Sequence, residues 1–204
     1  MSTVIADISV SLDGFITGPT DSMESLGQGV DRLHQWAYNL SSWREPHGLE
    51  GGETNADDAV MAETWQNLGA VVMGRRMFDH GEEPWGDTPP FHVPVFVVTH
   101  RAREPLSKDG GTTFTFVTDG FESAVQQARA AVGDKDVLVA GGGNIIQQLL
   151  SAGLLDELQI HLIPVLLGDG TRLFAQAGSE PIQLEITRVI ESAGVTHLRY
   201  RAPR

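Results

Sequence analysis

The chain has 204 residues, of which 41% are hydrophobic and 20% charged, and its formal net charge is −13. This is the composition of an ordinary globular protein of one domain, and the acidic balance excludes non-specific nucleic-acid binding. The lack of cysteine excludes disulfides, cysteine-ligated zinc and thiol nucleophiles, and it is typical of a reducing cytoplasm.

Targeting and membrane signals are also missing from the sequence. Met1 leads almost directly into an alternating stretch, without the basic and apolar regions of a signal peptide. No apolar run approaches the roughly 18 residues that a membrane-spanning helix needs. We therefore predict a cytoplasmic protein with no membrane partner and no nucleic-acid partner.

The chain begins with a predicted strand within residues 3–14. Val4, Ala6 and Ile8 occupy alternate positions, and Asp13-Gly14 ends the pattern. Residues 17–56 follow as a long excursion rich in Gly, Pro, Asp and Ser, with one possible helix over 31–40. Excursions of this length are usually functional or mobile, so both a lid over the active site and a disordered surface loop are considered.

The middle of the chain alternates helices and strands. A helix is predicted over 56–68, capped by Thr54 or Asn55, followed by a strand over 70–73 and a short helix from about Arg75. Residues 81–92 are predicted as a proline-rich loop. Two strands follow at 93–100 and 112–118, and Asp119 is expected to cap a helix with one apolar face, formed by Phe121, Ala124, Val125, Ala128 and Val132.

The last part of the chain adds one helix and several strands. A buried strand over 137–140 breaks at Gly141-Gly142-Gly143, and a helix follows with apolar residues at steps of three and four. A long strand is predicted over 158–167, and a hairpin of two strands over 182–202. This order predicts a single α/β domain over residues 1–204, in which helices flank a mainly parallel sheet that has antiparallel strands on its C-terminal side.

Three predicted strands end in glycine or in a cluster of polar residues. In open α/β sheets ligands bind beyond the carboxyl ends of the strands, where helix N-termini and glycines accept phosphate and arginine forks bind its oxygens. These ends together predict a site for a phosphorylated nucleotide, formed by Gly74, Arg75 and Arg76, by Thr99, His100 and Arg101, and by Gly141, Gly142, Gly143 and Asn144.

Each of these signals also has a purely structural interpretation. A glycine after a strand often forms a turn, the arginine pair suits a solvated helix face, and three glycines permit tight packing of helix on strand. The glycines do not form G-x-G-x-x-G, and G-x-x-x-x-G-K-[ST] is absent, so neither a Rossmann site nor a P-loop is predicted. The seven histidines show neither H-x-H nor H-E-x-x-H, so no metal site is predicted.

Four segments of the chain resemble a known family. SLDGFI (11–16), VVMGRRMF (71–78), VFVVTHR (95–101) and VAGGGNIIQQLLSAGLLDELQIHLIPVLLGDGTRLF (139–174) occur in this order. They are similar to the dihydrofolate reductase-like superfamily, and most of all to the reductase domain of bacterial riboflavin biosynthesis and its stand-alone relatives. The resemblance implies that superfamily's fold. It also implies a homodimer, which the apolar stretch 158–167 supports.

The resemblance further implies NADPH as the cofactor. By analogy Arg75 meets the 2′-phosphate of the adenosine ribose, and Arg76 lies near the pyrophosphate. The adenosine end is flanked by Thr99, His100 and Arg101, and the pyrophosphate is cradled by Gly142, Gly143, Asn144 and Ile145, next to Gly74 and Gly141. Met77 departs from a threonine that is frequent in the family, which implies that one cofactor hydrogen bond is lost or moved.

The substrate side is implied by fewer residues. Ser11 and Asp13 match positions that face the substrate in the riboflavin branch, although Asp13-Gly14 is equally a turn at the end of a strand. Asp58 lies near the place of the proton-relaying acid of dihydrofolate reductases, although acids also favour the first turn of a helix. Ala140 replaces a glutamate common in the riboflavin branch, which puts that branch's substrate in doubt.

The function implied by the resemblance is an NADPH-dependent reductase. It would transfer hydride to a C=N or C=O bond of a small heterocyclic substrate, as 5-amino-6-(5-phosphoribosylamino)uracil reductase does. A dihydrofolate or pterin-type reductase is one alternative. A non-catalytic NADP-binding module is another, because no catalytic acid stands out in the sequence.

Overall fold

The computed structural model describes residues 2–20, 22, 25, 27–175 and 181–203. The strands are β1 Val4–Ser11, β2 Leu68–Gly74, β3 Pro94–Val98, β4 Leu106–Ser107, β5 Thr113–Val117, β6 Asp136–Gly141, β7 Glu157–Ile163, β8 Glu185–Glu191 and β9 Thr196–Arg201. The α-helices are α1 Gln35–Tyr38, α2 Ser41–Arg44, α3 Ala56–Asn67, α4 Arg75–Gly81, α5 Phe121–Val132 and α6 Gly143–Ser151. Short 3₁₀ helices are η1 Val30–Leu33, η2 Glu45–His47 and η3 Asp109–Gly111.

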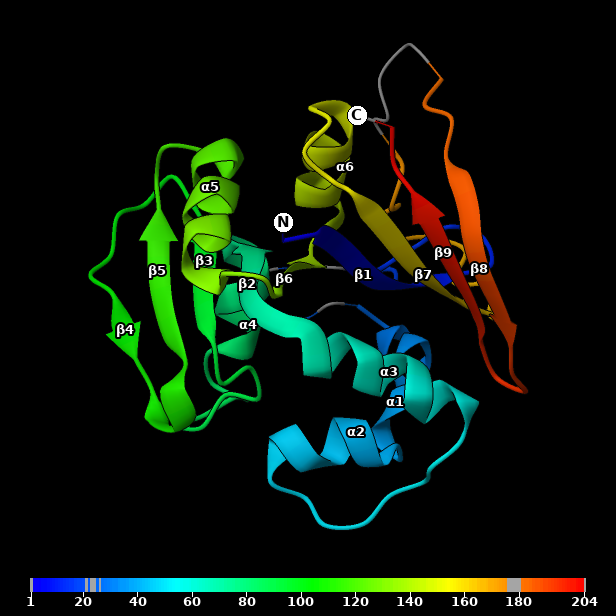
Figure 1. Cartoon of the computed structure of the whole chain (residues 1–204). Helices are drawn as coiled ribbons and strands as arrows, with labels where there is room; N and C mark the ends of the chain where they lie inside the picture. The colour runs from blue at the N-terminus through cyan, green and yellow to red at the C-terminus, as the bar shows by residue number, and fades with distance from the viewer. Residues whose placement is uncertain (1, 21, 23–24, 26, 176–180, 204) are drawn as a thin grey trace.

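The strands form one sheet in the order β4-β5-β3-β2-β6-β1-β7-β9-β8. Neighbours from β5 to β7 are parallel, whereas β4 and the β8–β9 hairpin pair antiparallel at the two sides (Figure 1). The predicted α/β class, with a mainly parallel sheet and a C-terminal antiparallel hairpin, is therefore confirmed. The parallel order brings the carboxyl ends of β2, β3 and β6 to one edge of the sheet.

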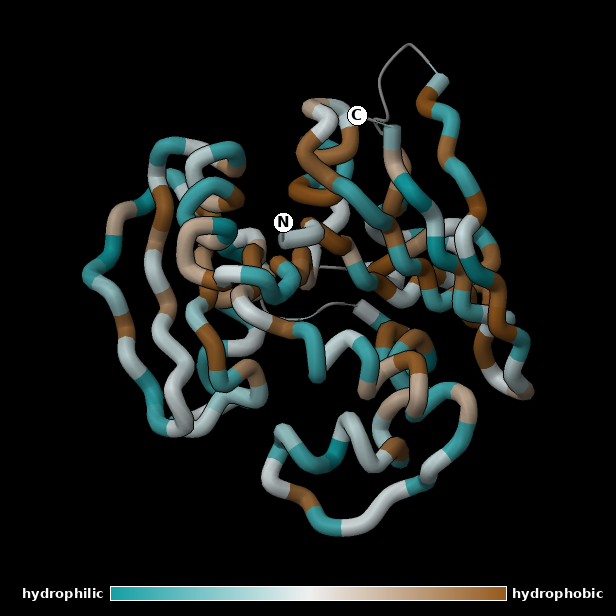
Figure 2. The backbone as a smooth tube through the Cα atoms, viewed as in Figure 1, coloured by the Kyte–Doolittle hydropathy of each residue, from teal (hydrophilic) through white to brown (hydrophobic). Residues whose placement is uncertain are grey.

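Helices cover both faces of the sheet. Because side chains alternate along a strand, Ala70 and Val72 of β2 pack in the cluster that contains α5 and α6, whereas Val71 and Met73 pack with Phe78 of α4. Figure 2 shows hydrophobic stretches along the central strands and α6, whereas the loop around α2 is mostly hydrophilic. The core thus fixes the central strands, whose ends point to one edge.

Three local predictions are corrected by the structure. The strand predicted over 158–167 ends at Ile163, because Pro164 has no N–H and Val165 donates instead to the Ile163 carbonyl at 2.8 Å. Asp119 does not cap α5. The N-cap is Gly120, with φ of 97°, and the Asp119 carboxylate accepts from the Ser123 hydroxyl at 3.2 Å. The predicted elements also lack the two-residue strand β4, which is too short for periodicity to reveal.

The excursion folds against the rest of the protein over residues 27–56. The helix predicted over 31–40 is instead η1 followed by the single turn α1, since a helix this short depends on its packing more than on its own propensity. Leu33, Ala37 and Leu40 are buried. A disordered surface loop is therefore wrong for this part, and the role of a lid stays a prediction. Residues 21, 23, 24 and 26 of the excursion lie outside the described residues.

Candidate functional site

A cleft of about 470 Å³ lies at the carboxyl edge of the sheet. The three predicted strand ends, separated by up to about seventy residues of chain, all line it. Of the predicted cofactor residues, the lining includes Gly74, Arg75, Arg76, Thr99, His100, Arg101, Gly142, Gly143, Asn144 and Ile145. Gly141 belongs to the same turn but is not part of the lining.

The first strand end carries Arg75 in a defined orientation. Its Nε donates to the Asp79 carboxylate at 2.6 Å, one helical turn further along α4. The guanidinium carbon also lies 5.8 Å from the ring centroids of both Phe78 and Phe116. Asp79 and two rings thus hold the side chain, which lines the cleft.

Arg76 and the second strand end complete the basic side of the cleft. Arg76 donates from a terminal nitrogen to the Ser22 carbonyl at 3.1 Å, so it contacts the excursion. At the end of β3 the buried Thr99 hydroxyl accepts from the Arg101 N–H at 3.1 Å and stabilises the turn there. His100 and Arg101 are exposed, and Arg101 approaches Asp79 to 3.7 Å.

The third strand end is a backbone surface made of glycine. Gly141 has φ of 111°, a conformation that favours glycine. Gly142 caps α6, and a Cβ built on it would meet no atom within 4 Å, so the backbone there is open to a ligand. A Cβ on Gly143 would lie 2.9 Å from the Ile16 side chain, so the residue directly before the excursion packs closely on the start of α6.

The cleft therefore has the chemistry of an anion site in an acidic protein. Three arginines line it, and the first N–H groups of α6, a nine-residue helix, have no partners within the helix. Asn144 at the same end accepts a hydrogen bond from the side-chain amide of Gln148, which also lines the cleft. No carboxylate is among the described residues that line the cleft.

Two of the three substrate-side candidates form a structural clasp. The Ser11 hydroxyl is buried, donates to the Asp13 carboxylate at 2.6 Å and accepts from the Phe15 N–H at 2.9 Å. Asp13 also accepts from the N–H groups of Leu167 and Gly168 at 3.2 and 2.8 Å. These bonds, chiefly the one from Ser11, lower the pKa of Asp13 to about 2. Neither residue lines the cleft, and both join the end of β1 to residues 167–168.

Asp58 also lies away from the cleft. Its carboxylate accepts from the Ser42 N–H at 2.8 Å, and its own N–H donates to the Asn55 side chain at 3.0 Å. The predicted cap by Asn55 is therefore confirmed. Asp58 joins α3 to α2, which is the structural interpretation of an acid in a first helical turn.

Sequence reasoning missed several residues around the cleft. Asp79 could have been found from its spacing, since RRMFD places it four residues after Arg75. Ile16, Thr17 and Thr171 line the cleft, but only the tertiary fold brings them there. No local pattern in the sequence signals these contacts.

A larger groove of about 990 Å³ lies at the amino ends of β1 and β7. It contains none of the predicted site residues. Two of its arginines already pair with carboxylates of the same groove, Arg129 with Asp156 at 2.8 Å and Arg201 with Glu185 at 2.6 Å. The carboxyl-edge cleft is therefore the better candidate for a bound anion.

The described residues carry neither a metal cluster nor a membrane-spanning helix. No group of three or more His, Asp or Glu side chains there is arranged to hold a metal ion. No helix in that part of the chain is both long enough and apolar enough to cross a membrane.

Comparison with known proteins places the chain in a family. It is 23% identical over 205 residues to the uncharacterized protein YyaP of Bacillus subtilis, covering 97% of this chain and 93% of that protein. A putative riboflavin biosynthesis protein of Shewanella sp. PV-4 superposes with a TM-score of 0.69 at 21% identity, over the full length of both chains. At these sequence identities the superposition is evidence of a shared fold only.

A second similar structure belongs to a longer protein. It is the diaminohydroxyphosphoribosylaminopyrimidine deaminase/5-amino-6-(5-phosphoribosylamino)uracil reductase of Thermotoga maritima, with a TM-score of 0.63 and 14% identity. The match covers 99% of this chain but 57% of that protein. The resemblance found in the sequence is confirmed. Because the model of the RibD C-terminal domain matches residues 2–198, the chain belongs to the RibD C-terminal domain family.

Proposed function

We propose that the protein is an NADPH-dependent reductase of a small heterocyclic substrate. The observation that carries the proposal is that three sequence-distant strand ends, two with arginine and one with glycine, line a single cleft. A cofactor with a pyrophosphate and a 2′-phosphate needs such separate anion contacts. The family and the reductases among similar structures support the same activity.

The residues of the cleft fit this cofactor. The open backbone at Gly142 and the start of α6 suit a pyrophosphate, which can approach N–H groups there without meeting a side chain. The Arg75 fork suits the 2′-phosphate, because Asp79 and the aromatic rings already restrict its motion. Arg101 and His100 suit the adenosine end, where they are exposed.

When bound, NADPH supplies the hydride, and the protein supplies binding and orientation. Arg75 and the glycine turn hold the phosphates at two separate points, which restricts the orientation of the remaining part. Met77 and Ile145 present apolar surface to the cleft, against which the uncharged part of the cofactor would pack. Positioning of this kind lowers the entropic part of the barrier to hydride transfer.

The substrate proposed is a pyrimidine-like heterocycle with a reducible C=N or C=O bond. Support comes from similar structures whose names include a uracil reductase and a pyrimidine reductase-like protein. Ala140, in place of the glutamate common in the riboflavin branch, favours a substrate that differs from that branch's own. A pterin is the neighbouring alternative, and a panel of both classes with NADPH oxidation as the readout separates them.

The 2′-phosphate assignment is tested by Arg75→Ala. Charge-assisted hydrogen bonds of about 1.5–3 kcal/mol predict a loss of NADPH affinity of roughly 10- to 100-fold, with little change for NADH, in fluorescence titrations. Arg103→Ala is the matched control. Arg103 lies over the same rings, at 5.4 and 5.2 Å, but pairs with Glu82 and does not line the cleft. Equal losses for both nucleotides would contradict the assignment.

A second candidate is an NADP-binding module without turnover. It is favoured by the absence of a carboxylate among the described residues that line the cleft, since such a group would be the usual proton donor. Tight NADPH binding with no oxidation by any pyrimidine, pterin or quinone would support it. Oxidation that depends on one of these substrates would exclude it.

A further inference from the structure

Four buried or half-buried side chains form a continuous hydrogen-bonded chain outside the cleft. The Asp7 carboxylate on β1 lies 2.6 Å from Nε2 of His161 on β7. Nδ1 of His161 lies 2.6 Å from Nδ1 of His197 on β9, and Nε2 of His197 lies 3.0 Å from the Asp57 carboxylate on α3. We call these four residues the Asp–His–His–Asp chain. It joins three strands of the sheet to the helix that covers them.

Water has little access to the two imidazoles. The side chains of His161 and His197 are 4% and 3% exposed. The Trp36 ring of α1 covers both, with centroids 4.5 and 5.1 Å away, and its Nε1 donates to the Ser9 hydroxyl at 3.1 Å. A hydrogen bond lost here cannot be replaced by bulk solvent, so its loss is costly.

The three hydrogen bonds fix the number of protons. Each contact needs one proton, and the central contact joins two nitrogens that would repel if both were bare. Two neutral imidazoles beside two carboxylates carry only two protons. The Asp–His–His–Asp chain therefore requires one more, which leaves it with a net charge of −1.

We propose that the Asp–His–His–Asp chain holds one shared proton and acts as a pH-sensitive clamp, which fastens α3 and α1 to strands β1, β7 and β9 of the sheet. Losing the proton leaves two lone pairs 2.6 Å apart, and gaining a second places two N–H groups there instead. Either change breaks the central bond. The central hydrogen bond of the clamp is therefore formed with one shared proton, and it is broken when that proton is lost or when a second one is bound.

Two members of the Asp–His–His–Asp chain have shifted pKa values with identifiable causes. Burial lowers the pKa of His197, although the hydrogen bond to Asp57 acts in the opposite direction. Burial raises the pKa of Asp7, but the charge and hydrogen bond of His161 outweigh it, so the net shift is downward. Both shifts have their causes in the same geometry, in which Nε2 of His161 faces Asp7 and Nε2 of His197 faces Asp57.

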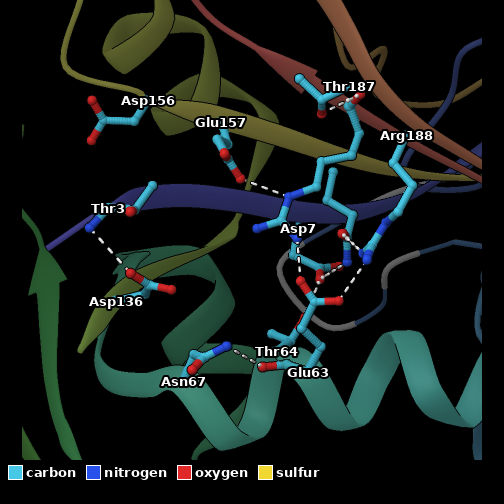
Figure 3. A network of polar contacts seen from close by, with 12 residues as sticks. Thr3, Asp7, Glu63, Thr64, Asn67, Asp136, Asp156, Glu157, Thr187 and Arg188 are labelled. Carbon is cyan, nitrogen blue, oxygen red and sulfur yellow. Dashed lines mark hydrogen bonds and ion pairs between the residues drawn. The ribbon is translucent and has the colours of Figure 1, made fainter. Parts of the chain in front are cut away.

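Other polar and charged groups face the clamp from each packed element. Thr64 of α3 and Gln159 of β7 donate to Asp7, and Ser192 after β8 donates to Asp57 at 2.9 Å. His34 lies beside α1. Its pKa is lowered mainly by burial, and electrostatic interaction with His161 lowers it further. Beyond Gln159 lies an ion-pair group, drawn in part in Figure 3, in which Glu63 pairs with Arg188 and Arg199, and Arg199 with Glu157.

The pH of greatest clamp stability follows from proton linkage. Unfolded, the two histidines have ordinary pKa values of about 6.5 and together bind one proton at pH about 6.5. Above that pH the two histidines bind more protons in the folded protein than in the unfolded protein, so the free energy of unfolding falls as pH rises. Below that pH they bind more protons in the unfolded protein, so the free energy of unfolding falls as pH falls. The contribution therefore peaks near pH 6.5.

The proton count can be measured on the intact protein. Long-range ¹H–¹⁵N spectra of histidine side chains at pH about 6.5 are expected to show three N–H protons over His161 and His197, with a strongly downfield proton between the Nδ1 atoms. Two neutral rings with one N–H proton each would overturn the proposal. This measurement needs no variant, so it does not depend on whether a substituted chain folds.

The clamp itself is tested by the double variant His161→Gln/His197→Gln. The melting temperature of the natural chain minus that of the variant, followed from pH 5 to pH 9, is expected to peak near pH 6.5. His92→Gln is the control, since the His92 side chain is exposed and its ring nitrogens lie against the carbonyls of Gly110 and Pro46, away from the Asp–His–His–Asp chain. A melting-temperature difference that does not change with pH would overturn the proposal. An equal peak in the difference between the natural chain and His92→Gln would overturn it too.

Discussion

Asp13 shows what a carboxylate does when it is bonded rather than catalytic. It accepts from Ser11, Leu167 and Gly168, and its pKa is lowered to about 2. A lowered pKa means that this stabilisation is complete above the unfolded pKa of about 3.9 and is lost as pH falls through about 2. The stabilising role of Asp13 is therefore confined to the charged form.

We predict that Asp13→Asn lowers the melting temperature at neutral pH, because an amide nitrogen would face an N–H donor. The difference from the natural chain is expected to shrink as pH falls from about 4 toward 2, where the natural carboxylate is protonated. Thermal melts over this range measure it. Asp134→Asn, at an exposed position, is the control and should show no such convergence.

Gly141 and Gly142 are neighbours with different requirements. Gly141 has φ of 111°, so Gly141→Ala is expected to lower the free energy of unfolding by about 1–3 kcal/mol. Gly142 has φ of −77° and open space where a Cβ would lie, so Gly142→Ala should change stability little while placing a methyl group at the proposed pyrophosphate site. Denaturant melts and NADPH titrations separate the two effects. A stability loss at Gly142 as large as that at Gly141 would contradict this distinction.

Helix α3 owes its start to Asn55, whose side chain accepts from the Asp58 N–H at 3.0 Å. Asn55→Ala is expected to cost about 1 kcal/mol in the free energy of unfolding, the usual value for a lost cap. Asn67→Ala, at the exposed far end of the same helix, should change it by less than about 0.5 kcal/mol. Urea denaturation of both variants checks the comparison. Equal losses would mean that the cap contributes no more than a surface contact.

The elements show what the sequence predicts well. Alternation along β1, helical spacing in α5 and α6, and glycines at the ends of β2 and β6 are local patterns, and each was interpreted correctly. The course of residues 30–47 was not predicted, because packing on the sheet decides it. Asp7 and Ser9 alternate like side chains on a solvated face, yet α3 and α1 cover them.

The candidate site was predictable for the same reason that the strands were. The carboxyl ends of parallel strands meet at one edge of the sheet, so the sequence predicts that Arg75, Arg101 and Gly142 lie together there. The pairing of His161 with His197 was not, since it joins β7 to β9 across thirty-six positions in the chain. Only the antiparallel register of these strands places the two rings opposite each other.

We propose that the protein forms a homodimer, although the support expected from the apolar stretch 158–167 does not hold. The apolar residues of β7 lie between β1 and β9 and serve the core. The open edge at β8 gives a better reason, since Ile186 and Val189 there are 63% and 56% exposed. Light scattering is expected to give about twice 22.1 kDa, and Val189→Lys about 22.1 kDa. A natural chain measured at 22.1 kDa would contradict the dimer.

The contact between Gly143 and Ile16 sets a mechanical limit. A Cβ at position 143 would lie 2.9 Å from the Ile16 side chain, so the residue that directly precedes the excursion already packs closely on the start of α6. The near end of the excursion therefore has little room to move toward α6. A methyl group at position 143 would push Ile16 away from α6 and widen the cleft at this point. A bound nucleotide would then make looser contacts.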